Sequence, residues 1–339
     1  MIKHDSKVEI KSIVSVVPEN KVLLSENYKE YGWTKKQAER IEKQIGIQQK
    51  HITTSDQTTF DLMHRALDET LDANSLSPDA IDALVVVTQT PDYNQPGNSK
   101  LLQDSASLKE NILCLDISSG CSGFTDGLLQ TVSLIEGLKL QNVILLVGDT
   151  ISKVVDPKDR ATAPLFGDAA SCILLSRSKN KGLIYAAYGT DGSGYKSLYI
   201  EEGGFRKPIE GNGKISMDGN EVMLFSITKE PKCIKDLMQF SGLNNNLIDY
   251  VVLHQANNYI IENIRKRIGF DKSQVLSKSF SVFGNTSSAS IPLSISYELN
   301  TSLEKNKKKF ILSGFGVGLS WSTIILDLEL DYCPEIIFL

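Results

Sequence analysis

The chain has 339 residues, and its 36 Lys and Arg residues against 41 Asp and Glu residues give a formal net charge of −5. Hydrophobic residues make up 41% of the chain, enough for a sizeable core, which excludes disorder as the dominant state. The mildly acidic balance argues against nucleic acid as a partner, because non-specific binding to nucleic acid requires a basic face.

The cysteines and the apolar runs narrow the class of protein further. Five cysteines with no Cys-x-x-Cys pair indicate neither a metal site nor a disulfide framework, and they suit a reducing cytoplasm. The N-terminal sequence MIKHDSKVEI lacks the apolar region of a signal peptide, and the longest apolar runs have only the length of strands. We therefore expect a cytoplasmic protein that holds no metal and does not contact a membrane.

Apolar runs alternate with segments of helical periodicity. In chain order we expect a helix at 61–71, strands at 83–87 and 112–115, a helix at 124–137, strands at 143–147, 172–175 and 250–253, a helix at 259–268, and strands at 310–312 and 323–326. Continuous apolar runs are typical of strands covered on both faces, so the alternation predicts an α/β fold.

The two halves of the sequence resemble each other weakly. In each half a buried strand is followed by a helical stretch and then by a turn of small residues, at 118–120 in the first half and at 283–285 in the second. We therefore predict an internal duplication, with one half at residues 1–178 and the other at residues 179–339. The polar segment 176–180 is the predicted junction.

Cys121 follows an expected strand and precedes an expected helix, within the sequence LDISSGCSGF at 115–124. Unpaired N–H groups at a helix N-terminus favour a thiolate, and glycines on both sides let a substrate approach the backbone closely. The alternative is a buried, inert cysteine, which is the commoner fate of a single cysteine. The other four cysteines lie in apolar runs or near the C-terminus and are expected to be structural.

Two polar residues of the second half are further candidates. His254 ends an apolar strand, and strand C-termini in α/β folds are where ligand sites gather, although a hydrogen-bonded core histidine fits equally well. Asn285 lies in a Gly–Asn turn, where it either caps a helix or presents its amide N–H₂ as a neutral donor. The glycines of the segment 314–318 follow a strand and could bring backbone N–H groups to an oxyanion, although the G-x-G-x-x-G fingerprint is absent.

The order Cys, His, Asn by itself suggests a papain-like cysteine hydrolase, but the local Cys-Gly-Ser-Cys-Trp context is missing and the duplicated α/β organisation does not fit. Another family fits better. Six segments resemble, in register, the signatures of the β-ketoacyl-acyl carrier protein synthase III family of the thiolase superfamily: GCSGF (120–124), FGDAA (166–170), MDGNEV (217–222), HQAN (254–257), GNTS (284–287) and GFGVG (314–318). The likeness runs from about residue 8 to about residue 328.

The resemblance implies a thiolase-like duplicated αβαβα five-layered fold, a homodimer and a buried site reached by a pantetheine tunnel. Cys121 would be the nucleophile that an acyl thioester acylates. His254 and Asn285 would donate hydrogen bonds to a malonyl thioester carbonyl while CO₂ leaves, and the backbone N–H groups of Cys121 and Val317 would hold the oxyanion of the acyl-cysteine. No cofactor is implied, because CoA and phosphopantetheine thioesters are the substrates.

The residues that bind substrate or CoA carry over by position. Arg160, Asn220 and Asn257 occupy binding positions of the family. Arg40 and Gln44 stand where typical members carry a tryptophan and an arginine that clamp the CoA adenine, so the stacking face is lost.

Other departures concern the carrier protein and the acyl pocket. Lys266 and Arg267 remain of the basic patch that receives an acyl carrier protein, while Leu224 and Tyr259 replace two of its charges. In addition, Val317 replaces a glycine, and Gln95, near Tyr93, occupies the region that usually closes the acyl pocket with a phenylalanine. These departures favour an unusual starter group or a specialised pathway over acetyl-CoA and fatty-acid initiation.

Three hypotheses follow from the sequence. The first is a decarboxylating condensing enzyme that uses acyl-CoA or acyl carrier protein and malonyl-acyl carrier protein. The second is an acyltransferase of the same family that passes the acyl group from Cys121 to an oxygen or nitrogen acceptor. The third, a non-catalytic partner subunit, is disfavoured because Cys121, His254 and Asn285 are all present.

Overall fold

The computed structural model describes residues 1–339. Its helices are α1 (Leu24–Asn27), α2 (Lys35–Ile41), α3 (Thr59–Ala73), α4 (Asn98–Ser105), α5 (Gly123–Leu138), α6 (Gly219–Ser241), α7 (Asn258–Ile268), α8 (Ser279–Phe283) and α9 (Ser290–Glu298). Its strands are β1 (Ile2–Val17), β2 (Lys21–Leu23), β3 (Gln49–His51), β4 (Ala83–Val87), β5 (Leu113–Ile117), β6 (Asn142–Asp149), β7 (Ala169–Thr190), β8 (Leu198–Ile200), β9 (Ile215–Met217), β10 (Tyr250–Leu253), β11 (Val275–Leu276), β12 (Lys308–Gly316), β13 (Ser320–Leu328) and β14 (Ile337–Phe338). None of the helices is long and apolar enough to cross a membrane.

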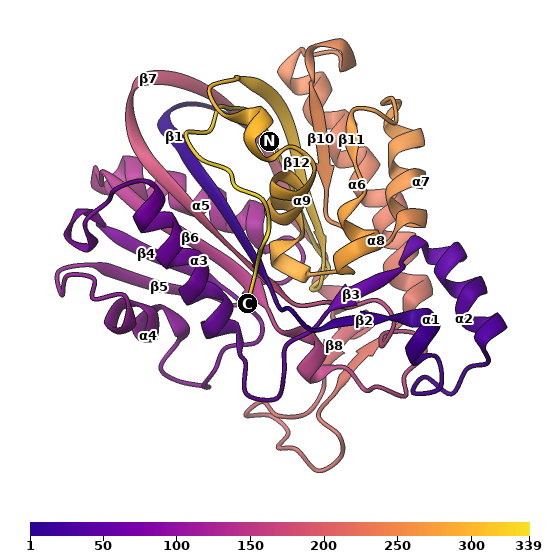
Figure 1. The fold of residues 1–339 in the computed structure, drawn as a ribbon. Helices are drawn as coiled ribbons and strands as arrows, with labels where there is room; N and C mark the ends of the chain where they lie inside the picture. Colours follow the sequence, from indigo (N-terminus) through magenta and orange to yellow (C-terminus); the bar gives the residue numbers. More distant parts are fainter.

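One long strand joins the two halves of the molecule. The main sheet has the strand order β11-β10-β12-β13-β7-β6-β4-β5, with β1 antiparallel to β7. The first part of β7 pairs with β6 and its last part pairs with β13 (Figure 1). Residues 176–180, where the sequence predicted a polar junction, lie within β7, a strand that pairs with strands from both sides of that junction.

Three large hydrophobic cores fill the spaces between the layers: one central core around α5 and α9, and one core under the outer helices of each half. The even-numbered residues of β4 and β6 face α3 and α4, while the odd-numbered residues face α5 in a central core. α9 lies in the same central core, against the even-numbered residues of β10 and β12, whose odd-numbered residues face α6 and α7. Helices therefore cover both faces of the main sheet, with α5 and α9 between its two halves, which confirms the predicted αβαβα fold. Because both faces of these strands are buried, their sequences are continuous apolar runs.

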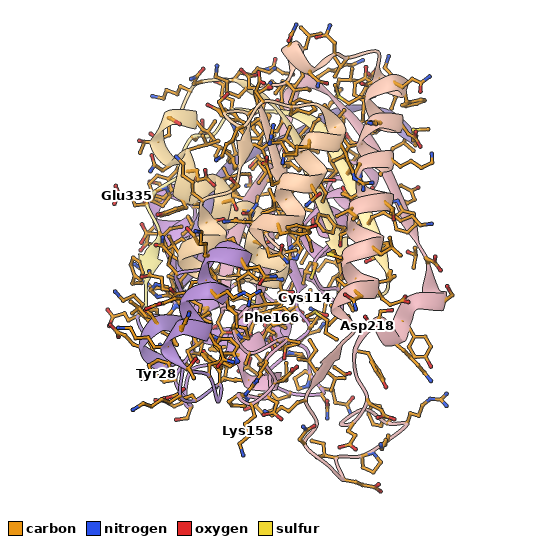
Figure 2. The ribbon with its side chains drawn as sticks, turned by 90° about the vertical axis from the view of Figure 1, so that its right-hand side faces the viewer. Tyr28, Cys114, Lys158, Phe166, Asp218 and Glu335 are labelled. Atoms are coloured by element: carbon orange, nitrogen blue, oxygen red, sulfur yellow. The ribbon has the colours of Figure 1, made fainter.

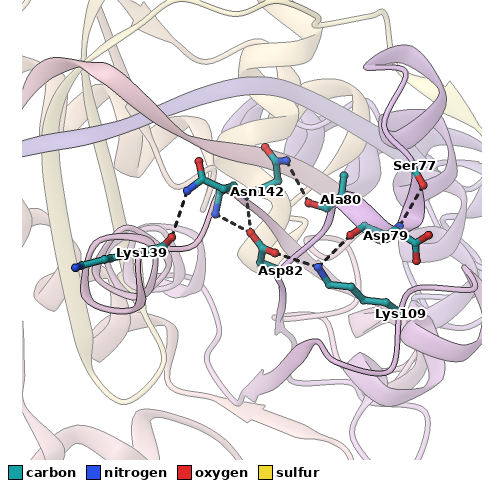
Figure 3. Close-up of polar contacts among 8 residues, drawn as sticks. Ser77, Asp79, Ala80, Asp82, Lys109, Lys139 and Asn142 are labelled. Carbon is teal, nitrogen blue, oxygen red and sulfur yellow. Dashed lines mark hydrogen bonds and ion pairs between the residues drawn. The ribbon is translucent and has the colours of Figure 1, made fainter.

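A polar cluster ties together the amino ends of three parallel strands (Figure 3). Asp82, directly before β4, accepts hydrogen bonds from the backbone N–H groups of Gln141 (2.7 Å) and Asn142 (3.3 Å) at the start of β6. The ammonium group of Lys109, from the segment before β5, donates to the same carboxylate (3.0 Å). The carboxyl ends of these strands lie at the opposite edge, where α/β folds place their sites.

Candidate active site

Cys121 lies between β5 and α5 and is 5% exposed. Burial raises the pKa of its thiol to about 12, while hydrogen bonds from the Val317 backbone, the Ser287 hydroxyl and its own N–H oppose that rise. The sequence predicted a thiolate because of the helix end. In the structure desolvation outweighs the helix end, so Cys121 of the free protein is a thiol.

The turn between β12 and β13 packs directly onto the nucleophile. A Cβ atom on Gly316 would lie 2.5 Å from Cys121 Cβ and 2.8 Å from its sulfur, a space that only a residue without a side chain leaves open. This close approach brings the N–H of Val317 to the sulfur, where the N–H of Cys121 also lies. The two donors predicted for an oxyanion are therefore together.

His254 follows β10 directly and is 1% exposed. Its backbone N–H donates to the Ser313 carbonyl (2.8 Å), its Nδ1 lies 2.7 Å from the Ser290 hydroxyl, and its ring meets the edge of Phe315 at 5.5 Å between centroids. Burial lowers the pKa of the imidazole to about 3, with the Ser287 backbone opposing. The ring is therefore neutral at physiological pH and has one N–H to donate.

Asn285 follows α8, and both its backbone and its side chain are held in place. Its backbone N–H donates to the Leu165 carbonyl (2.8 Å), and its own carbonyl accepts from Gly167 N–H (3.1 Å). Its Oδ1 accepts a hydrogen bond from the Ser287 backbone N–H (2.9 Å). Because the carbonyl side of the amide is engaged, the N–H₂ side is the one left to donate, as the sequence interpretation requires.

Ser287 links these groups, and sequence reasoning did not single it out. Its backbone N–H donates to Asn285 Oδ1 (2.9 Å), and its hydroxyl accepts from Gln89 Nε2 (3.1 Å). Its hydroxyl also opposes the rise in pKa that burial causes at Cys121 and Asp149. Its φ of +51° lies in the left-handed region, a backbone state that a serine holds only where its surroundings fix it. Asp149 was also not singled out from the sequence. It is the last residue of β6, and its position at the carboxyl end of a strand could have marked it as a candidate site residue.

The predicted CoA-binding residues lie at the surface around this centre. Arg40 lies in the last turn of α2, Asn220 lies in the first turn of α6, and both are exposed. Arg160 is exposed and donates to the Gly32 carbonyl (2.7 Å). Asn257 is half-buried, and its side chain caps α7 by accepting from the Ile260 N–H (2.8 Å).

Figure 2 labels three neighbours of these elements, Tyr28, Lys158 and Asp218, along the lower part of one face. Lys158 is two residues from Arg160, and Asp218 is the residue before α6. The surface predicted to hold CoA therefore combines α2, the segment before β7, and the starts of α6 and α7.

The expected carrier-protein residues lie on the last turn of α7. Lys266 and Arg267 are exposed there, and Lys266 is 3.6 Å from the Glu262 carboxylate. Leu224 on α6 and Tyr259 on α7 are 60% and 54% exposed, so two large side chains with apolar surface face solvent where the resemblance predicted charges.

Four surface pockets of the free chain lie away from the proposed nucleophile. None of them is lined by Cys121, His254 or Asn285, and one of about 320 Å³ lies between β1, β7 and α5 instead. No three His, Cys, Asp or Glu side chains are arranged to hold a metal ion.

Comparison with known proteins identifies the fold and the family. Residues 115–192 match the model of 3-oxoacyl-[acyl-carrier-protein] synthase III, and residues 238–328 match the model of its C-terminal part. Solved structures with the same fold include a 3-oxoacyl-(acyl-carrier protein) synthase from Burkholderia xenovorans, with a TM-score of 0.95 and 31% identity over 100% of this chain and 99% of that one. The priming β-ketosynthase of the R1128 polyketide pathway has a TM-score of 0.88 and 25% identity over 98% and 99% of the two chains.

Curated relatives agree with the structural matches. The β-ketoacyl-[acyl-carrier-protein] synthase III of Staphylococcus epidermidis is 33% identical over 289 residues, which are 85% of this chain and 89% of the relative. That of Staphylococcus aureus is 32% identical over the same shares. Fold and site together define a thiolase-like condensing enzyme. The chain belongs to the β-ketoacyl-acyl carrier protein synthase III family, as its six motifs predicted.

Proposed function

We propose that the protein loads an acyl group from a CoA or carrier-protein thioester onto Cys121 and condenses it with malonyl-acyl carrier protein, with loss of CO₂. The observation that carries this proposal is that backbone donors of Cys121 and Val317 lie at the nucleophile sulfur, while the side chains of His254 and Asn285 are buried and neutral. Neutral hydrogen-bond donors at His254 and Asn285 suit the stabilisation of an enolate, whereas groups that can only accept a hydrogen bond could not stabilise it.

The first half-reaction transfers the acyl group. The Cys121 sulfur loses its proton and attacks the thioester carbonyl, and the oxygen becomes an oxyanion held by the N–H groups of Cys121 and Val317. The oxyanion then collapses, the bond to the pantetheine sulfur breaks, and the leaving thiolate takes up one proton, which balances the one that Cys121 lost. These donors cost no reorganisation during the step, because both already face the sulfur.

The second half-reaction forms the carbon–carbon bond. His254 and Asn285 donate hydrogen bonds to the thioester carbonyl of the malonyl group, the bond to the carboxylate breaks, and CO₂ leaves an enolate. The enolate carbon attacks the acyl carbonyl and Cys121 leaves as the thiolate. A neutral imidazole suits this role, since an imidazolium would protonate the carbanion, and burial keeps the pKa of His254 at about 3.

Acyl transfer to an oxygen or nitrogen acceptor is not favoured. Its acceptor would need a general base to take its proton, and the pKa of His254 is too low for a base at neutral pH. The matched relatives are also named as synthases.

We further propose that the protein is a cytoplasmic homodimer. β5 is the last strand of the sheet, so its outer edge has no partner within the chain. Leu113, Leu115 and Ile117 of this strand are only half-buried, which a second β5 across a two-fold axis would correct. All five cysteines are free, which supports a reducing compartment.

The test is intact-protein mass after incubation with a panel of acyl-CoA and acyl carrier protein thioesters. The wild-type protein is expected to gain one acyl group and Cys121→Ala none, while Cys114→Ala, which removes the half-buried cysteine of β5, keeps the adduct. An adduct that persists on Cys121→Ala contradicts the assignment of the nucleophile.

The second stage adds malonyl-acyl carrier protein to the acylated protein. Release of CO₂ and a β-ketoacyl product is expected, and His254→Ala or Asn285→Ala should lower this rate by about 10²–10³ while the adduct still forms. A protein that never consumes the malonyl thioester but transfers its acyl group to an alcohol or amine would favour the acyltransferase instead.

The same assay separates the acyl donors. Because Arg40 replaces a stacking tryptophan, which is worth about 1–3 kcal/mol on a nucleobase, we propose weak discrimination in favour of free CoA. Lys266 and Arg267 would receive an acidic carrier protein with strong salt dependence. An acetyl-CoA rate that exceeds every carrier-bound rate at low and high salt would refute this.

A further inference from the structure

The backbone of Asn285 is bonded to a segment from the other half of the sequence, residues 163–168. The Asn285 N–H donates to the Leu165 carbonyl (2.8 Å), and the Gly167 N–H donates to the Asn285 carbonyl (3.1 Å). Phe166 and Asn285 thereby form a parallel β-bridge. The position of the Asn285 amide therefore depends on how firmly this segment is held.

Lys50, in β3, is a buried lysine that binds the start of the segment. It is 6% exposed, its ammonium group donates to the Ala163 carbonyl, and its nitrogen lies 6.0 Å from the centre of the Tyr31 ring. Burial lowers the pKa of Lys50 to about 8, while the charges of Asp168 and Glu30 oppose that fall. At neutral pH the group is therefore a charged hydrogen-bond donor in the protein interior.

Asp168 binds the end of the segment on two sides. Its backbone N–H donates to the carbonyl of His51, the neighbour of Lys50 (2.8 Å). Its carboxylate is fully buried and accepts from the N–H (2.8 Å) and the hydroxyl (2.8 Å) of Thr53, and from the N–H (2.9 Å) and the hydroxyl of Ser152. Four donors compensate the burial of one carboxylate and fix where it lies.

The turn before Asn285 packs directly onto these groups. A Cβ atom on Gly284 would lie 2.7 Å from the Leu165 carbonyl oxygen and 3.3 Å from Lys50 Cβ. Backbone therefore meets backbone here, with no flexible side chain between to absorb a shift. Because a close-packed interior transmits displacements, a movement of the segment 163–168 is passed on to Asn285.

We propose that Lys50 and Asp168 are positioning residues for Asn285, because they fix the segment 163–168 and through it the amide that donates to the malonyl carbonyl. This proposal rests on the role of Asn285 in the proposed function. Both residues act in the second half-reaction alone, since the acylation of Cys121 relies on the backbone donors at its sulfur. A displacement of about 1 Å in such a site costs about 10²-fold in rate.

The first test compares the two half-reactions in Lys50→Met, which removes the ammonium group and keeps an unbranched side chain. The adduct on Cys121 should form within about twofold of the wild-type rate, while kcat for malonyl-acyl carrier protein falls by about 10². Lys50→Arg restores a donor to the Ala163 carbonyl and should recover most of kcat. As a control, Lys109→Met removes an ammonium bond to the Asp79 carbonyl (3.0 Å) at the opposite edge of the sheet and should change neither rate.

A double-mutant cycle shows whether Lys50 acts through Asn285. In the Asn285→Ala background, Lys50→Met should lower kcat no further, because the amide that Lys50 positions is gone. A further loss of about tenfold or more in that background would overturn the proposal. Equal losses of acylation rate and of kcat in Lys50→Met alone would overturn it too, since they would show a general structural role.

A second measurement, amide hydrogen exchange, needs no substrate. Peptides that contain 163–168 and 283–287 should exchange about tenfold faster in Lys50→Met, with no change in α5. Thr53→Val, which removes one hydroxyl bond to Asp168, should show the same pattern and also serves if Lys50→Met does not fold. Unchanged exchange in both variants overturns the proposal. If the wild type consumes no malonyl thioester, the proposed function fails, and hydrogen exchange still decides whether these residues hold the segment.

Discussion

Glu230 is a fully buried acid in the middle of α6, within the core between that helix and the sheet. Its Oε1 accepts from the Ser313 hydroxyl and from the Thr323 hydroxyl (3.2 Å), and its Oε2 has no hydrogen-bond partner. Burial raises the pKa of this carboxyl from 4.5 to about 8. The hydrogen bonds from the two hydroxyl groups oppose this rise but are the smaller effect. At neutral pH the folded protein therefore holds Glu230 as the neutral acid.

The size of the effect follows from linkage between protonation and folding. Each pKa unit corresponds to about 1.4 kcal/mol of unfolding free energy. The whole shift of Glu230 therefore changes the stability by about 5 kcal/mol between low and high pH. The pKa is raised on folding, so the contribution of Glu230 to stability is fully present below about pH 4.5. It is lost progressively as the pH rises to about 8, and above that it stays constant.

Glu230→Gln removes the titration while keeping the shape of the side chain. Its amide nitrogen falls near the position of the unpartnered Oε2, which costs about 1–3 kcal/mol at every pH. Glu230→Leu removes the polar group altogether and leaves the Ser313 and Thr323 hydroxyls bonded to each other (2.6 Å). We expect Glu230→Leu to be more stable than the wild type at pH 8 by several kcal/mol, within the bound of about 5 kcal/mol.

The assay is urea unfolding at equal protein concentration between about pH 5 and 8. The stability of each variant minus that of the wild type should increase by about 1.4 kcal/mol per pH unit over this range, because only the wild type pays to neutralise the acid on folding. Parallel curves for the wild type and both variants would refute the reasoning, since they would mean that Glu230 titrates alike in the folded and unfolded chains.

Three further predictions concern other parts of the molecule. Asp82→Asn should cost about 1–2 kcal/mol of unfolding free energy. Burial opposes ionisation of Asp82, but the Gln141 N–H and Lys109 together lower its pKa below 3.8, so the cost should be seen above about pH 4 and vanish in acid. Gly316→Ala must displace the turn from Cys121, and its acylation rate should fall by about 10²–10³, with melting temperature as the control. Light scattering at micromolar concentration should give a dimer, and a monomer would contradict the proposed pairing of β5.

Strands covered on both faces could be predicted from the sequence, and elements with mixed surroundings could not. β4 and β10 have the predicted bounds, because their whole length is apolar. β1 was missed because charged residues alternate with others in its first half, where the strand is partly exposed. α6 was missed because it continues through Pro231, a residue that normally signals a helix end.

The residues of the candidate site also fall into a group that could be predicted from the sequence and a group that could not. Cys121, His254 and Asn285 could be predicted because each lies in a local sequence that matches a family motif. Ser287 and Asp149 are brought together through contacts between separate loops, and no periodicity within one segment shows which loops meet. The raised pKa of Cys121 was missed for the same reason, since the helix end is a local feature whereas burial depends on the whole fold.

The pairing of β1 with β7 has a consequence for how the chain is made. The Ser15 hydroxyl bonds to that of Ser171, 156 residues later. At about 5–20 residues per second, a ribosome takes roughly 8–30 s to deliver that partner, and during this time β1 is an unpaired strand. Lys3, Asp5 and Lys7 alternate along its first half, and charges on a waiting strand oppose pairing with other nascent chains. The pattern that obscures β1 as a strand in the sequence thus protects the chain during its synthesis.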